Sequence, residues 1–218
     1  PNGAGKTTLL RAALGLVEAS GELRLGDAAP RTLSARQRAL RAAYLPQRPQ
    51  SIWPVSVEAL VALGRFAHGA APDRLGPQDQ RAVDEAIQAC DLDALRHRRM
   101  DEISGGEKAR AHLARTVAQR APLILLDEPT AGLDPAQALA VAAIIRAHAV
   151  ADGAAIFSTH DIAFAASVAD RILLMKSGRP LAQGAPLEAL TPEALREAYG
   201  RPARLERFGD SFAAIFER

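Results

Sequence analysis

Short unbroken apolar runs alternate along this chain with segments in which apolar residues recur at helical spacing. The runs 123–126 and 155–158 contain no alternating polar positions, which is typical of parallel strands buried on both faces. Apolar positions three or four residues apart predict helices over 6–16, 107–120, 136–150 and 162–168. Strands that alternate with helices indicate an α/β fold built on a parallel sheet.

The other predicted elements are shorter. They are an edge strand over 21–25, a helix beginning at Ser34, a strand over 43–45, a hairpin formed by 172–175 and 180–183, and a helical tail over 186–199. Over residues 47–101 the pattern is mostly helical, with a loop at 69–76 and its own proline and glycine residues at the boundaries of its elements. This block predicts a helical subdomain inserted into the α/β core.

Length and charge exclude several classes of protein. A chain of 218 residues suits one domain with a small insertion, and 27 basic against 25 acidic residues leave a formal charge of +2. Basic and acidic residues are interleaved, so we expect no nucleic-acid partner. The densest basic cluster, 96–99, is predicted to be a solvated helix end.

The cysteine content and the apolar runs limit the location of the protein. Cys90 is the single cysteine, which excludes an intramolecular disulfide, favours a reducing compartment and predicts an inert, packed thiol. No apolar stretch approaches the ~20 residues needed to cross a bilayer, so any membrane role is expected to be peripheral. The chain opens on Pro1 without a methionine or an apolar leader, and we expect it to be a fragment of a longer protein.

The first eight residues, Pro-Asn-Gly-Ala-Gly-Lys-Thr-Thr, fit the phosphate-loop pattern G-x-x-x-x-G-K-[ST] from its second position onward. Glycines let successive backbone N–H groups converge on phosphate oxygens, and the following helix adds its positive N-terminal end. Lys6 is expected to reach the β- and γ-phosphates and the Thr7 hydroxyl to hold Mg²⁺. The candidate nucleotide-binding residues of this loop are Asn2, Gly3, Ala4, Gly5, Lys6, Thr7 and Thr8.

Two further segments bear on the same chemistry. The apolar run 123–126 leads directly into Asp127 and Glu128, so two carboxylates stand where open α/β sheets place ligands. Asp127 suits a Mg²⁺ ligand, and Glu128 suits a base that orients and deprotonates the attacking water. Ser104, Gly105 and Gly106 open a helix, with Ser104 as its N-cap and the glycines allowing close approach of a phosphate.

In this combination the sequence resembles the ABC ATPase family, whose hallmark is Ser-Gly-Gly shortly ahead of a strand that ends in Asp-Glu. The resemblance covers nearly the whole chain. By it, Gln47 matches the glutamine that senses Mg²⁺ and links to the membrane partner, Asp134 lies in the D-loop, and His160 is the switch histidine. The departures are Ile103 for the usual leucine, Lys108-Ala109-Arg110 for basic-Gln-Arg, and the missing start of the domain.

The resemblance implies a RecA-like core of the P-loop NTPase type that lacks its N-terminal strands. The core would comprise 1–46 and 105–185, the helical subdomain 47–104, and a C-terminal helical tail 186–218. It also implies ATP and Mg²⁺, with Thr7, Gln47 and Asp127 as metal ligands and Glu128, His160 and Gln47 as catalytic residues. Two subunits would pair head to tail, so that Ser104–Gly106 of one faces the phosphate loop of the other.

A second resemblance concerns the class of transporter. Trp53-Pro54-Val55-Ser56-Val57-Glu58 followed by Val61 to His68, with the tail over 178–199, resembles importer ATPases for iron–siderophore complexes, haem and vitamin B12. The implied partners are transmembrane permease subunits and a substrate-binding protein on the far side, with the ATPase on the cytoplasmic face of the membrane. The alternatives are a degenerate or truncated ATPase without turnover and a soluble ABC ATPase not linked to transport.

Overall fold

The computed structural model describes residues 1–49, 54–209 and 211–216, and these residues form two compact units. The terminal unit comprises Pro1–Leu9 and Ser158–Arg218, and the central unit comprises Leu10–Phe157. Trp53, part of the importer-like segment, lies outside the described residues.

The central unit contains a three-stranded sheet in the order β1 (Ala42–Leu45), β2 (Leu123–Asp127) and β3 (Ala154–Ser158). β1 and β2 pair in parallel, from Ala42 opposite Leu123 to Leu45 opposite Leu126. β2 lies in the middle, where its residues 124–126 are at most 1% exposed. The sheet is therefore of the parallel α/β type that the apolar runs predict.

Two predictions for this unit were wrong. β3 is not buried on both faces: Ile156 is 48% exposed, because β3 is the edge of the described sheet and has β2 as its one strand neighbour there. Residues 21–25 form no strand, since Leu25 pairs only with Ala28 across its own turn in an isolated bridge. The Leu25 side chain packs into a core cluster with Leu10, Leu14 and Leu33, and this packing accounts for its apolar character.

Helices of the central unit begin where the sequence supplies caps. Ser34 and Ser104 each form a capping box, ahead of α2 (Ala35–Arg41) and α5 (Gly105–Ala118), and Asp134 caps α6 (Pro135–Val150). Ser56 caps α3 (Val57–Ala62), which continues as the 3₁₀ helix η2 (Leu63–His68). The remaining helical elements are α1 (Lys6–Ala13), η1 (Pro30–Thr32), α4 (Pro77–Ala89) and η3 (Asp93–Leu95).

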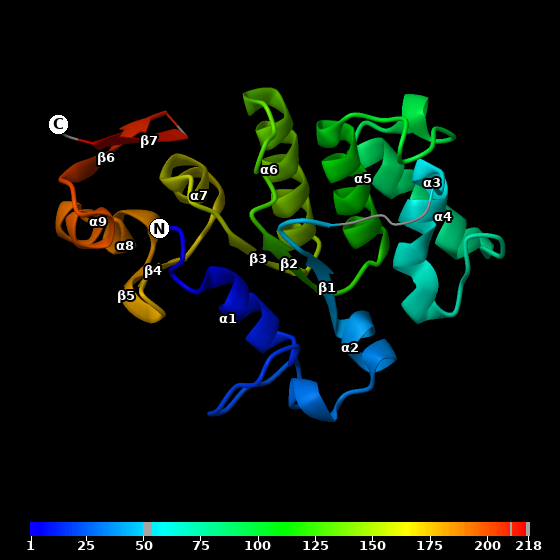
Figure 1. Ribbon diagram of the computed structural model, residues 1–218, viewed down its shortest axis with the longest axis horizontal. Coiled ribbons are helices and arrows are strands. Elements are labelled where there is room, and N and C mark those ends of the chain that lie inside the picture. The colour runs from blue at the N-terminus through cyan, green and yellow to red at the C-terminus, as the bar shows by residue number, and fades with distance from the viewer. Residues whose placement is uncertain (50–53, 210, 217–218) are drawn as a thin grey trace. The chain divides into compact units, whose positions relative to one another are not determined.

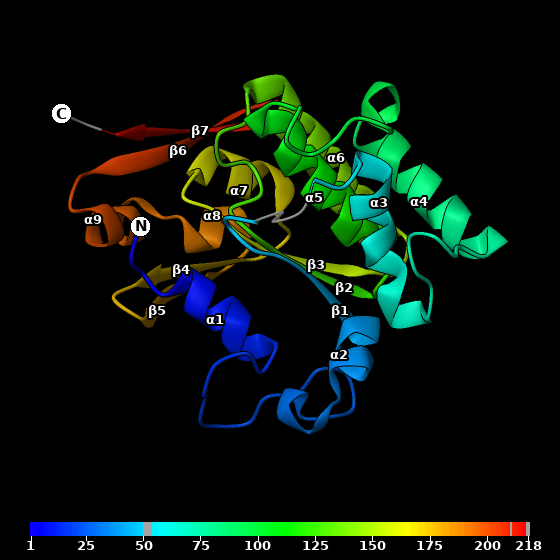
Figure 2. The ribbon, with the colours of Figure 1, turned by 45° about the vertical axis from the view of Figure 1, so that its right-hand side comes forward.

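α3 and α4 lie within the segment 47–104, and they pack on each other and on α5, which the sequence assigned to the core; together the three helices form one helical block, as Figure 1 and the turned view in Figure 2 show. η2 packs closely against the end of α5 at Gly64 and Arg65. A Cβ at Gly64 would lie 2.3 Å from the Arg115 carbonyl oxygen. Arg65 is 3% exposed and donates to Asp79 Oδ1 and to the Ala118 carbonyl, both at 2.8 Å. The guanidinium therefore satisfies carbonyl groups that the end of α5 leaves open.

Cys90 and Arg96 also belong to this block. Cys90 is buried and burial raises the pKa of its thiol to about 12, which agrees with an inert packing role. The prediction of a solvated basic cluster is wrong for Arg96, whose side chain is 23% exposed and forms ion pairs with Glu58 and Asp84.

His112, on α5, provides a test of the packing through pH. It is 2% exposed, and burial, assisted by the charge of Arg115, lowers its pKa from 6.5 to about 4. The unfolded chain takes up a proton as the pH falls below 6.5, whereas the folded chain does not until pH 4, so stability is lost across this window. From pH 7.5 to 5.0 we expect a loss of about 2 kcal/mol from this residue. Urea unfolding of the parent and His112→Leu at both pH values measures it, and equal pH dependence in the two proteins would contradict it.

The terminal unit contains the hairpin of β4 (Ile172–Lys176) and β5 (Arg179–Gly184), with helices α7 (Ile162–Val168), α8 (Pro186–Ala189) and α9 (Pro192–Tyr199). Its core cluster consists of Ile162, Ala166, Leu190, Leu195 and Ala203. The predicted helical tail is only partly helical. Residues beyond Tyr199 form an antiparallel hairpin of β6 (Ala203–Phe208) and β7 (Ser211–Phe216), whose Phe212 and Ala214 pack against that cluster.

Candidate functional site

The phosphate loop lies in the terminal unit and has the backbone that its glycines allow. Gly3 and Gly5 have φ values of +71° and +94°, in the region that glycine adopts without strain. α1 begins at Lys6 and has no acidic residue in its first turn. The Lys6 ammonium donates to the Pro1 carbonyl oxygen at 2.9 Å, so its side chain folds back along the loop. An ammonium group and a helix N-terminus beside one loop favour an anion there.

The β4–β5 turn supports this loop. The Gly178 amide donates to the Ala4 carbonyl oxygen at 3.1 Å, and a Cβ on Gly5 would lie 3.5 Å from the Gly178 Cα. Ala4 itself is 2% exposed. The loop is therefore also held by a backbone hydrogen bond from a residue 174 positions further along the chain, which the sequence patterns did not indicate.

His160 also lies in the terminal unit, between the end of β3 and the start of α7. Its side chain is exposed. Asp161 caps α7 by accepting from the Phe164 amide at 2.9 Å, and the Thr159 hydroxyl accepts from the Asp161 amide at 3.0 Å. These two bonds hold the backbone on the C-terminal side of His160.

The acidic pair ends β2 in the central unit. Asp127 is 1% exposed, and Glu128 is half-buried with φ +52°. A non-glycine residue in the left-handed region costs of order 1 kcal/mol and is found most often at functional sites. The backbone therefore turns sharply right after the buried carboxylate. Gln47 follows β1 by two residues and is exposed. Because β1 and β2 are parallel neighbours, Gln47 and the acidic pair leave the sheet at the same edge.

Ser104, Gly105 and Gly106 form the start of α5, also in the central unit. The Glu107 amide donates to Ser104 Oγ at 3.3 Å, and the Ser104 amide donates to Glu107 Oε2 at 2.7 Å. The bond from the Ser104 backbone lowers the pKa of Glu107. Ser104 and Gly105 are exposed, so this helix start is accessible from outside the unit.

Sequence reasoning missed Gln137, which lies against the second glycine. A Cβ on Gly106 would meet Gln137 Oε1 at 3.3 Å. The backbone amide of Gln137 donates to Asp134 Oδ1 at 2.9 Å, so Asp134 serves here as the N-cap of α6. Gln137 could have been found from the sequence by its position three residues after the helix cap Asp134.

The predicted site residues thus fall into two groups. The phosphate loop and His160 belong to the terminal unit, whereas Gln47, the acidic pair, Ser104–Gly106 and Asp134 belong to the central unit. Among the described residues, no three His, Cys, Asp or Glu side chains lie close enough to hold a metal ion by themselves. None of the described helices is long and apolar enough to cross a bilayer.

Comparison with known proteins decides the family. The family described as ABC transporter matches residues 1–131, which is more than half of the chain. The chain belongs to the ABC transporter family. As a member it is an ATP-binding protein with ATPase activity, and its fold is that of the ABC ATPases.

Two curated relatives and one solved structure illustrate the likeness of this ABC protein. It is 43% identical to a hemin import ATP-binding protein of Streptomyces coelicolor over 206 residues, covering 94% of this chain and 73% of the relative. It is 38% identical to a protein of the same description from Pseudomonas aeruginosa, covering 95% and 82%. An inward-facing metal-chelate type ABC transporter matches 100% of this chain and 82% of its own, with a TM-score of 0.79 and 25% identity.

Proposed function

We propose that this protein is the ATP-hydrolysing subunit of an importer that takes up a metal chelate, and that it works as a head-to-tail homodimer. The main support for the dimer is the exposed, glycine-rich start of α5. It offers an exposed helix start suited to an anion in addition to the phosphate loop, which supports a site that a partner subunit completes.

In this proposal the phosphate loop and Lys6 hold the β- and γ-phosphates of ATP. Glu128 orients and deprotonates the attacking water, and His160 holds the γ-phosphate. Ser104 and Gly106 of the partner subunit complete the site, and Asp134 holds the α6 start beside them. Catalysis then rests on positioning and on charge neutralisation.

The residues proposed for Mg²⁺ offer a hydroxyl, an amide and a carboxylate: Thr7, Gln47 and Asp127. Oxygen donors of this kind suit Mg²⁺, which usually takes one or two protein ligands and completes its shell with phosphate and water. The ion neutralises charge on the phosphates when it is bound. A single buried carboxylate at the end of β2 agrees with such a site.

The membrane partner is proposed to be a pair of permease subunits, with a substrate-binding protein on the far side. Leu63 and Phe66 lie three residues apart on η2 and are 42% and 71% exposed, which supports a docking role for the segment from Gln47 to Phe66. The protein would lie at the cytoplasmic face of the membrane. The names of the relatives favour haem, and an iron–siderophore complex or cobalamin is the proposed alternative cargo.

Ser104 gives a direct test of the dimer because the chain contains a matched control. Ser34 caps α2 with the same capping box, its Oγ accepting from the Gln37 amide at 3.2 Å. Each Ser→Ala change is expected to cost about 1 kcal/mol of stability. Only Ser104→Ala should also lower ATP turnover of the full-length protein, by at least about tenfold, because it removes a contact with the partner's ATP. Equal turnover in the two variants would contradict the dimer.

Transport tests the importer. The full-length protein and its permease, reconstituted in proteoliposomes with the binding protein, are expected to accumulate haem when ATP is supplied on the side of the ATPase. Iron–siderophore and cobalamin serve as parallel cargoes, and Lys6→Ala as the inactive control. ATP hydrolysis without accumulation of any of the three would reject the proposed transport role.

A further inference from the structure

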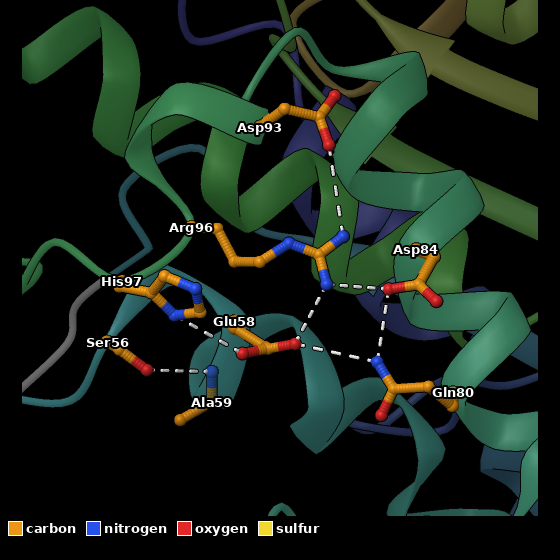
Figure 3. Close-up of polar contacts among 8 residues, drawn as sticks. All are labelled: Ser56, Glu58, Ala59, Gln80, Asp84, Asp93, Arg96 and His97. Carbon is orange, nitrogen blue, oxygen red and sulfur yellow. Dashed lines mark hydrogen bonds and ion pairs between the residues drawn. The ribbon is translucent and has the colours of Figure 1, made fainter.

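Arg96 joins three segments of the helical block through its guanidinium group, as Figure 3 shows. Its Nη1 donates to Asp84 Oδ1 on α4 at 2.7 Å and to Glu58 Oε1 on α3 at 3.0 Å. Gln80 Nε2 donates to the same Asp84 oxygen at 3.1 Å. We call Glu58, Gln80, Asp84 and Arg96 the Arg96 clamp.

The clamp places one cation between two carboxylates at a partly exposed site. The side chains of Arg96, Glu58 and Asp84 are 23%, 28% and 43% exposed. The hydrogen bond that Arg96 donates to Asp84 raises the pKa of Arg96, against the effect of burial. Without the guanidinium, Glu58 and Asp84 would repel each other across the gap between α3 and α4.

Backbone hydrogen bonds join the segment 96–100, which begins at Arg96, to residues 55–58. The Glu58 amide donates to the Arg96 carbonyl oxygen at 3.0 Å and the Val57 amide to that of Arg98 at 2.9 Å. The Met100 amide donates to the Val55 carbonyl oxygen at 2.9 Å, and Ser56 and Arg99 form an antiparallel bridge. The segment therefore runs along 55–58 like a short strand, with Arg96 at one end.

The other end of this segment leads directly to the start of α5. Met100 and Ile103 are 2% and 7% exposed, so both side chains are anchored in the core on either side of residues 101–102. Ser104 follows Ile103 at once. Only residues 101–103 thus separate the segment 96–100 from Ser104, and the buried side chains of Met100 and Ile103 fix both ends of this short link.

We propose that Arg96 is a positioning residue for the helix start Ser104–Gly106. By locking 96–100 against α3 and α4, it sets where this helix start lies and thereby how well it meets ATP bound to the partner subunit. The inference rests on the proposed head-to-tail dimer. It assigns to Arg96 a role in closing the dimer and none in binding ATP to a single subunit.

The test separates these two events in the full-length Glu128→Gln protein, in which a closed dimer should persist. ATP-dependent dimer formation is followed by sedimentation, and ATP affinity of the monomer by a fluorescent nucleotide. Arg96→Gln is expected to weaken dimer formation by about tenfold or more, with monomer affinity unchanged. Arg96→Lys should recover part of the loss because it restores the cation. Glu58→Gln gives a second route to the same loss if Arg96→Gln does not fold.

Two controls distinguish positioning from general loss of stability. Arg99→Gln removes an exposed ion pair with Asp101 on the same segment. Ile87→Val trims a fully buried residue of α4 and lowers the stability of the block without removing any charge of the clamp. Both should dimerise like the Glu128→Gln parent. Equal dimerisation of Arg96→Gln and that parent, or an equal loss in Ile87→Val, would overturn the role of Arg96. Failure of the Glu128→Gln parent itself to dimerise with ATP would instead reject the proposed function.

Discussion

Glu128→Gln is expected to lower ATP turnover of the full-length protein by about 100-fold or more while ATP binding is retained. The amide has nearly the shape of the carboxylate, so the strand end and its left-handed backbone should remain intact. It cannot accept a proton from the attacking water. The change therefore removes the proposed base and leaves the phosphate loop as it is. Turnover is measured by phosphate release, and binding by a fluorescent nucleotide.

Glu85→Gln is the matched control for this prediction. Glu85 lies on α4 in the same unit, 64% exposed, where it pairs with Arg120. Loss of an exposed ion pair costs at most about 1 kcal/mol and should leave turnover unchanged. Parent-like hydrolysis by Glu128→Gln would remove Glu128 from the mechanism and leave another group to be found as the base.

Gly64→Ala should have the largest effect on stability, a loss of about 3 kcal/mol or more. The new Cβ would lie 2.3 Å from the Arg115 carbonyl oxygen and 3.2 Å from the Gln119 backbone nitrogen. Both atoms belong to the backbone at the end of α5, which cannot shift without disturbing that helix and the Arg65 bond to Ala118. Urea unfolding followed by circular dichroism measures the loss.

Gly76→Ala provides the comparison for Gly64→Ala. Gly76 precedes α4 in the same helical block, and a Cβ there meets only Asp79 Oδ2, at 3.6 Å, which is an ordinary contact. We expect a change of less than about 1 kcal/mol. Similar losses in the two variants would show that the close approach of η2 to α5 is not what requires glycine at position 64.

The sequence predicted those elements best whose structure depends on residues close together in the chain. The unbroken run ending at Leu126 predicted a buried strand, and Ser104 predicted a helix start; both are confirmed. Gly3 and Gly5, which the sequence assigned to a glycine-rich loop ahead of a helix, have positive φ in the structure. Each of these features depends on residues within a few positions of one another, so the linear pattern contains most of the information needed.

The misses depend on partners that are distant in the chain. Ile156 was expected to be buried, but burial of a strand depends on which strands flank it, and β3 is an edge in the described sheet. Arg96 was expected in solvent, and its partners Glu58 and Asp84 lie 38 and 12 residues away. The β6–β7 hairpin was missed because its strands pack on α7 and on the core cluster of the terminal unit.

The turn between β4 and β5 has a consequence for how the nucleotide affinity of this protein can change. Ser177 and Gly178 both have positive φ, as a tight two-residue hairpin turn requires, and the amide that supports Ala4 belongs to that turn. Lengthening the turn by one residue would remove the Gly178–Ala4 hydrogen bond without changing any residue proposed to contact ATP. Insertions in this hairpin, which is remote from the phosphate loop in the sequence, would therefore change the affinity for ATP and leave the residues proposed for hydrolysis unchanged.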